Sequence, residues 1–154
     1  MEETVEQQFI NYCRNGELEL AQVVFNSNPN VACNVCNNAF FVACLSGHLN
    51  VAQWLYTVKQ SFACWTIMCA FSAACRSSHL HIVQWLHGVY SSIISYNDAF
   101  YCACDDGNYD IAQWLLFFVP NVNIAVVTQN MQAKLNESSL LYCLHHKNIN
   151  MLML

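Results

Sequence analysis

A segment of 17 residues occurs four times along the chain, and this repetition constrains the fold more than any other feature. The copies align without gaps over residues 8–24, 39–55, 70–86 and 99–115, so they start 31, 31 and 29 residues apart. Repetition at a nearly constant interval indicates a repeat protein, in which each unit contacts mainly its neighbours. The copies share a cysteine at Cys13, Cys44, Cys75 and Cys104, a turn residue at Gly16, Gly47, Ser78 and Gly107, a glutamine at Gln22, Gln53, Gln84 and Gln113, and a tryptophan at Trp54, Trp85 and Trp114.

Each copy predicts two short helices joined by a turn. In the second copy, Phe40, Ala43 and Cys44 have the i, i+3, i+4 spacing of one helical face, and the same spacing returns after Gly47. Two short helices cannot bury their apolar faces alone, so the copies must stack to form a continuous core. The sequence therefore predicts one all-α domain over residues 1–154, a solenoid of helical hairpins. Its predicted units are 5–35, 36–66, 67–95 and 96–120, followed by a degenerate unit over 121–154.

Composition and charge exclude several classes of protein. Hydrophobic residues make up 56% of the chain, which excludes a chain disordered through low hydrophobicity. The net charge is −5 with only five lysines and arginines, so no nucleic-acid partner is expected. The most apolar window, 111–127, contains Gln113, Pro120, Asn121 and Asn123, so no membrane span is expected. The acidic start MEETVEQQ is unlike a signal peptide, and the ten cysteines are expected to be reduced thiols of a cytoplasmic protein.

The segment ACLSGHLNVAQWL, residues 43–55, resembles an ankyrin repeat, with His48 and His79 after the turn where that family has histidine. The resemblance covers roughly residues 5–120 and is greatest to divergent arrays of large DNA viruses and amoebae. It implies a non-enzymatic protein-binding adaptor without a cofactor, directed at a host factor if the source is viral. The openings NAFF, CAFS and DAFY depart from the family pattern, so plain loops are expected at least as much as β-hairpins between units. Another helical-hairpin solenoid is the alternative fold.

The resemblance also implies where a partner binds, because ankyrin arrays contact partners with the tips between repeats and the exposed face of the first helix. The residues before each turn and at the start of each first helix are therefore candidates. They are Arg14, Asn15, Leu45, Ser46, Arg76, Ser77, Asp105 and Asp106 before the turns, and Asn37, Met68 and Asn97 at the helix starts. These positions differ between copies whereas the packing positions are alike, as expected of a constant scaffold with a variable surface. Ordinary solvated turn residues are the alternative interpretation.

Sites with chemistry are less favoured. Cys33 and Cys36 have the spacing of half a zinc site, but a second pair is missing. Cys102 and Cys104 diverge by about 200° on a regular helix, as adjacent His145 and His146 also diverge. Asp105 and Asp106 disfavour a thiolate at Cys104. Because Cys104 is one of the repeated cysteines and Cys102 matches Val42 and Ala73 in other copies, both are interpreted as packing residues, with the aspartates as a contact surface.

Aromatic and terminal residues leave further alternatives. The repeated tryptophans predict core packing rather than a platform for nucleic-acid bases, and the repeated glutamines predict either a hydrogen-bonded ladder or a solvated face. Four aromatic residues between the units either anchor a partner or fold back onto the stack: Phe62, Trp65, Tyr90 and Tyr96. The apolar end MLML predicts docking on a partner or self-association, so a structural or assembly fragment is the second functional hypothesis.

Overall fold

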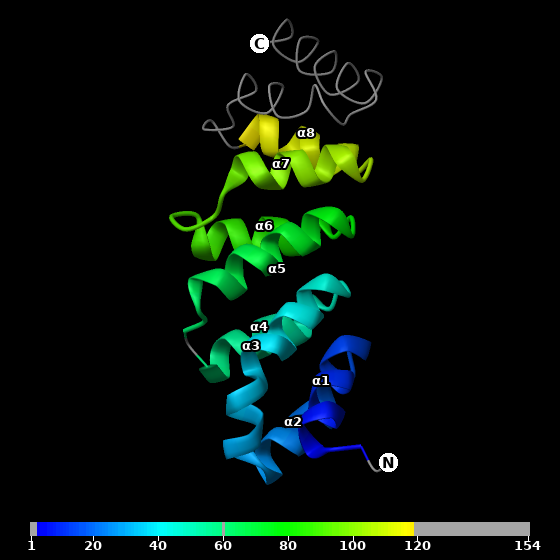
Figure 1. The fold of residues 1–154 in the computed structure, drawn as a ribbon, viewed down its shortest axis with the longest axis vertical. Helices are drawn as coiled ribbons and strands as arrows, with labels where there is room; N and C mark the ends of the chain where they lie inside the picture. Colours follow the sequence, from blue (N-terminus) through cyan, green and yellow to red (C-terminus); the bar gives the residue numbers. More distant parts are fainter. Residues whose placement is uncertain (1–2, 60, 119–154) are drawn as a thin grey trace, which may run out of the picture.

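The computed structural model describes residues 3–59 and 61–118, and within these ranges every regular element is an α-helix. The helices are α1 (Val5–Asn15), α2 (Leu18–Ser27), α3 (Pro29–Leu45), α4 (Leu49–Lys59), α5 (Cys64–Arg76), α6 (Leu80–Tyr90), α7 (Tyr96–Asp105) and α8 (Tyr109–Phe118). They form four successive hairpins that stack along the long axis, with the N-terminus at one end (Figure 1). The predicted all-α architecture of stacked hairpins is thus confirmed for the described part. The described ranges contain no β-strand, so the connections between these units are plain loops.

The turn residues bend the chain between the two helices of each hairpin. Gly16, Gly47 and Gly107 have φ angles of 79°, 87° and 74°, and Ser78 has a φ of 63°. This left-handed conformation ends a helix by letting the following N–H groups bond back to its last carbonyls. Glycine adopts it without the steric cost of a β-carbon, which explains its recurrence at this position.

The core repeats with the sequence. Phe9, Phe40, Phe71 and Phe100 hold the same position in the first helix of each unit and are at most 1% exposed. The shared cysteines, from Cys13 to Cys104, are also at most 1% exposed, which confirms that they are packing residues. Each unit therefore contributes one phenyl ring and one thiol to the same two layers of the core.

The tryptophans join neighbouring units. Trp54 in α4 contacts Phe9 and Phe25 of the preceding unit, with ring centroids 6.3 and 5.5 Å away. Trp85 in α6 likewise contacts Phe40 and Tyr56. All three tryptophans are half-buried against the core, so the predicted packing role is confirmed. Gln53, Gln84 and Gln113, just before them, are exposed, which fits the interpretation of a solvated face.

The start of α3 differs from the prediction. The helix begins at Pro29 and runs for 17 residues, although the second unit was predicted to begin at residue 36. Proline is favoured at the first helical position because its missing N–H would lack an intrahelical partner there in any case. Asn37 therefore lies in the middle of α3, and Met68 lies one turn inside α5, rather than at helix starts. Asn97 is the second residue of α7, close to its predicted place.

The predicted degenerate unit over 121–154, and the self-association expected of it, lie outside the described residues.

Within the described ranges, the helices are too short or too polar to cross a membrane.

Candidate protein-binding surface

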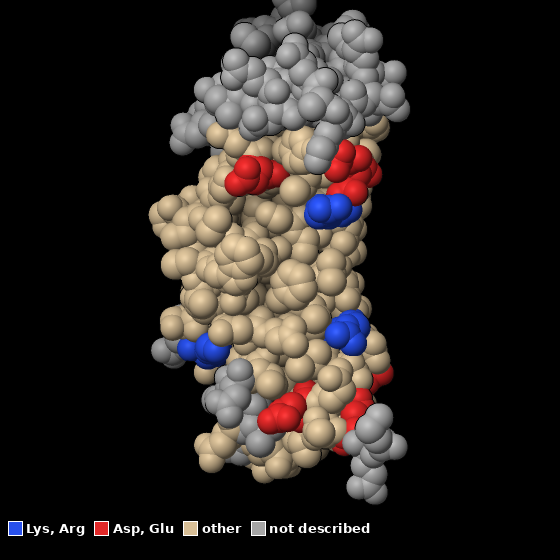
Figure 2. All heavy atoms as spheres, viewed as in Figure 1, with Lys and Arg blue, Asp and Glu red and all other residues tan. Residues whose placement is uncertain are grey.

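The candidate residues before the turns lie at the C-terminal ends of the four first helices. We call these eight residues the turn row: Arg14, Asn15, Leu45, Ser46, Arg76, Ser77, Asp105 and Asp106. The first helices pack on one another in the order α1, α3, α5 and α7, so their C-terminal ends follow one another along the stack. Two members, Ser46 and Ser77, are half-buried and the other six are exposed. Charged side chains are few, and on the face shown in Figure 2 the carboxylates gather toward the two ends of the described part.

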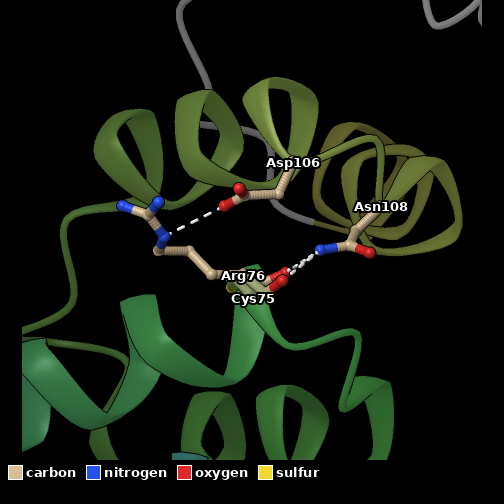
Figure 3. A network of polar contacts seen from close by, with 4 residues as sticks. All are labelled: Cys75, Arg76, Asp106 and Asn108. Carbon is tan, nitrogen blue, oxygen red and sulfur yellow. Dashed lines mark hydrogen bonds and ion pairs between the residues drawn. The ribbon is translucent and has the colours of Figure 1, made fainter.

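Two members of the turn row form an ion pair that joins the third and fourth units. The Arg76 guanidinium Nε lies 3.0 Å from a carboxylate oxygen of Asp106 (Figure 3). Both side chains are partly exposed, so this ion pair contributes little to stability. Arg14 and Arg76 are the basic members of the turn row, and Asp105 and Asp106 are the acidic ones. Because Arg76 is paired with Asp106, its charge is largely balanced within the surface.

In the third and fourth units, the residue after the turn reaches back to the preceding unit. The Asn108 side-chain amide donates to the carbonyl oxygens of Cys75 and Arg76, at 2.9 and 2.6 Å (Figure 3). His79 Nε2 donates to the Leu45 carbonyl oxygen at 3.0 Å. The last carbonyls of a helix lack intrahelical partners. Asn108 and His79 provide the missing hydrogen-bond donors, and so they hold in place the helix ends that carry Leu45 and Arg76.

The histidines also lie close to the glycine turns. A β-carbon added at Gly16 would be 2.5 Å from His48 Nδ1, and one added at Gly47 would be 2.7 Å from His79 Cε1. Burial lowers the pKa of His79, the Leu45 carbonyl opposes this, and the neighbouring imidazoles of His81 and His48 lower it further. Glycine at these turns therefore provides both the backbone conformation and the space for the imidazole of the next unit.

A hollow of about 240 Å³ opens between α3 and α5. It is lined by Asn37, Asn38 and Phe41 of α3 and by Trp65, Thr66 and Cys69 of α5. Trp65 is 75% exposed, although tryptophan is usually buried over most of its surface. The Asn37 side-chain oxygen Oδ1 accepts a hydrogen bond from Lys59 Nζ at 3.1 Å, which holds Asn37 in one wall of the hollow.

Of the four aromatic residues predicted between the units, Trp65 is the one that projects from the stack. Phe62 folds back and stacks on Phe40 with ring centroids 4.1 Å apart. Tyr90 packs edge-on against Tyr56, and Tyr96 packs edge-on against Phe71. Sequence reasoning assigned Asn37 to the surface but missed Asn38, Phe41 and Cys69. The usable signal was Trp65, a tryptophan outside the repeated indole position.

Three of the buried core thiols are held in their neutral form. Burial, with a smaller effect of nearby Cys36, raises the pKa of Cys13 to about 12. Burial also raises the pKa values of Cys44 and Cys75 far above the ordinary thiol range. A thiol that stays protonated is a poor nucleophile and a poor metal ligand.

Cys102 is the thiol closest to the charges of the turn row. Burial raises its pKa, Arg76 opposes this, and Asp106, Asp98 and Asp105 raise it further. In residues 3–59 and 61–118, no three histidine, cysteine or acidic side chains are grouped so that they could hold a metal ion. The side chain of Cys33 and both His145 and His146 lie outside the described residues.

The sequence matches no protein-family model, and no curated protein matches it. The functional conclusion therefore depends on the repeated core and on the surface that the core positions. That surface comprises the turn row and the hollow beside Trp65.

Proposed function

We propose that this chain is a protein-binding module of the ankyrin type, and that its partner contacts the turn row and the hollow between α3 and α5. The observation that carries the proposal is Trp65, which is 75% exposed at the edge of that hollow. An exposed indole is costly to leave in water, and tryptophan is enriched among the residues that dominate binding energy at protein interfaces.

The contrast between buried and exposed positions supports the same proposal. Phenylalanine and cysteine recur at the buried positions of all four units. In the turn row, by contrast, Arg14, Leu45, Arg76 and Asp105 occupy the same position in successive units. The exposed position thus varies between arginine, leucine and aspartate, and a uniform core with a varied surface suits recognition of one particular partner.

The chemistry of the hollow favours a polypeptide partner. The side-chain amides of Asn37 and Asn38 can donate and accept hydrogen bonds, as a peptide backbone requires. Phe41 and the Trp65 ring offer apolar contact beside them. The raised pKa values of the buried thiols support binding rather than thiol chemistry. The resemblance to viral and amoebal arrays makes a cytosolic host protein the first partner to seek.

Affinity capture from cell extracts, followed by mass spectrometry, tests this proposal. The wild-type chain is compared with Trp65→Ala, with the charge reversals Arg14→Glu and Asp105→Lys, and with Gln84→Ala as a control. Gln84 is exposed on the second helix of the third unit, away from the proposed surface. We expect a partner that the wild type and Gln84→Ala retain and that Trp65→Ala loses by about tenfold or more, equivalent to about 1.4 kcal/mol. Equal capture by all variants would exclude this surface.

A further inference from the structure

The first unit exposes apolar side chains at positions that the other units bury. Leu20 and Val23 of α2 are 47% and 61% exposed. The position of Leu20 corresponds to Val51, Ile82 and Ile111, each of which is 0% exposed. The position of Val23 corresponds to the tryptophans that are half-buried in the other units. We call Leu20 and Val23 the N-terminal end face.

The contacts between units show what normally covers these positions. Trp54 of the second unit is covered by Phe9 and Phe25 of the first unit. Trp85 of the third unit is covered by Phe40 and Tyr56 of the second. In the described residues, Leu20 and Val23 of α2 are exposed at the corresponding positions. In the second and third units the position of Val23 is a tryptophan that packs against aromatic side chains of the preceding unit.

Carboxylates border this face. Leu20 also lines a hollow of about 480 Å³ together with Leu18, Glu17, Glu19, Gly16 and Asn50. Residues 3–27 contain four glutamates and one arginine, which gives −4 + 1 = −3. Figure 2 shows carboxylates at the N-terminal end of the molecule. An apolar floor with an acidic border is complementary to a helix with an apolar stripe and a basic border.

A second copy of the chain is a poor occupant by the same reasoning. Two N-terminal end faces placed against each other would bring two units of charge −3 together. Like charges opposed across an interface are unfavourable and disfavour that pairing. The face therefore fits a partner with the opposite charge better than it fits itself.

We propose that the N-terminal end face is a second docking site, which binds an amphipathic helix of another protein through an apolar stripe flanked by lysine or arginine. Leu20 and Val23 contact the stripe, and Glu17 and Glu19 pair with the basic side chains. The site uses α2 and the turn before it, and neither the hollow at Trp65 nor the turn-row residues of the later units. It is therefore separate from the Trp65 hollow, which carries the function proposed above.

Two synthetic helical peptides of equal length test this site. Both carry the same leucine and phenylalanine stripe, flanked by lysine in one and by glutamate in the other. Fluorescence anisotropy measures their dissociation constants for the wild-type chain at low and at physiological salt. We expect the lysine peptide to bind at least about tenfold more tightly than the glutamate peptide, and its affinity to fall as salt screens the charges.

Matched variants separate the apolar floor from its acidic border. Val23→Asp should weaken the lysine peptide about tenfold or more. Val58→Asp should leave its affinity unchanged, because Val58, another exposed valine at 39%, lies on α4 and outside the N-terminal end face. The double variant Glu17→Lys with Glu19→Lys should reverse the preference toward the glutamate peptide. Bound lysine peptide should also slow hydrogen exchange in α2 but not in α6.

Three results would overturn the proposal. Equal loss of binding in the Val23 and Val58 variants would show that the contact is not specific to α2. An unchanged preference in the double glutamate variant would remove the role of the acidic border. A wild-type dimer in sedimentation that Val23→Asp converts to monomer would identify a second copy as the occupant. Far-ultraviolet circular dichroism checks folding, and the double glutamate variant changes only exposed positions.

Discussion

Ser78 has a left-handed backbone conformation that glycine provides in the other three units. Its φ is 63°, against 79°, 87° and 74° at Gly16, Gly47 and Gly107. For a residue with a β-carbon this conformation costs roughly 1–2 kcal/mol. The third unit therefore has a strained turn within a pattern that the others satisfy without strain.

Replacing Ser78 with glycine is expected to stabilise the fold. The gain should be about 1 kcal/mol, because relief of the backbone strain exceeds the added flexibility of the unfolded chain. Urea unfolding followed by circular dichroism measures it. Ser77→Gly is the matched control, since Ser77 has a φ of −92° that any residue adopts, and it should give no gain. An equal effect of both variants would show that backbone strain at Ser78 is not the cause.

For single residues, the sequence predicted which positions form turns and core better than it predicted how exposed a particular side chain is. The turn residues and the buried cysteines followed from the alignment, because each copy repeats the same local requirement. Trp65 did not follow from it, since its 75% exposure depends on how α5 is placed beside α3. The sequence left open whether Trp65 projects into solvent or folds back as Phe62 does, and only the packing of the helices decides between these two arrangements.

Some neighbouring hairpins are joined by a side chain that donates hydrogen bonds to the last carbonyl oxygens of a helix in the preceding unit. Asn108 donates two to the C-terminal end of α5, and His79 donates one to the C-terminal end of α3. Asparagine and histidine are thus alternative donors at one position of the repeat.

Asn108→Ala should weaken the junction between the third and fourth units. Removing its amide takes the donor from two carbonyl oxygens, which should cost about 1–3 kcal/mol of unfolding free energy. Asn108→His is the matched control, because histidine donates from the same position in the third unit, and it should retain most of the stability. Chemical unfolding of the three proteins checks this. Equal losses in both variants would contradict a role based on hydrogen-bond donation.

The lowered pKa of His79 predicts a dependence of stability on pH. Its ordinary value is 6.5, and burial lowers it in the folded state. The unfolded chain therefore binds the proton more readily. The contribution to stability is complete above the unfolded pKa and is lost as pH falls through the folded pKa. Unfolding midpoints measured from about pH 7.5 to pH 5 should fall for the wild type.

His79→Asn isolates this effect, because asparagine occupies the same position in the fourth unit and does not titrate. The other histidines are the same in both proteins, so the comparison isolates residue 79. We expect the midpoint of the variant to fall less steeply with acidification than that of the wild type. Parallel curves would mean that His79 titrates alike in the folded and unfolded chains.

Helix ends were predicted more accurately than helix starts, for a physical reason. Each first helix ends near a residue in the left-handed conformation, and glycine marks that conformation in three of the four units. Starts lack a comparable signal. Thr4 caps α1 by accepting from the Gln7 N–H at 3.2 Å, whereas the residues before α3 and α5 make no such side-chain bond. The early start of α3 at Pro29 could therefore not be predicted from a capping residue in the sequence.

For the whole molecule, the linear stack explains which parts of the candidate site were predictable. The turn row belongs to the repeat itself, so its place on the helix ends followed from the alignment. The hollow at Trp65 and the N-terminal end face arise only when helices from different units pack together or when a unit has no neighbour. Such features depend on the assembled stack and could not be assigned from the sequence of a single copy.

The stack also predicts how the chain unfolds. In a repeat protein, stability is approximately a sum of unit terms and of contacts between adjacent units. Phe9 and Phe71 occupy the same buried position, in the first unit and in the third. Replacing either with alanine should remove about 3–5 kcal/mol locally. Among the described residues, Phe71 has a unit on each side, whereas Phe9 has a unit on one side.

We therefore expect the two variants to differ in where they lose structure. Phe9→Ala should accelerate hydrogen exchange in α1 and α2 and leave α5 to α8 protected, because an end unit can open without its neighbours. Phe71→Ala should accelerate exchange in α3 to α8, since the central unit supports the contacts on both sides. Trp65→Ala is the control, because its exposed ring contributes little to the core and exchange should stay as in the wild type. If Phe9→Ala instead accelerated exchange evenly along the chain, the units would unfold together and the additive description of the stack would fail.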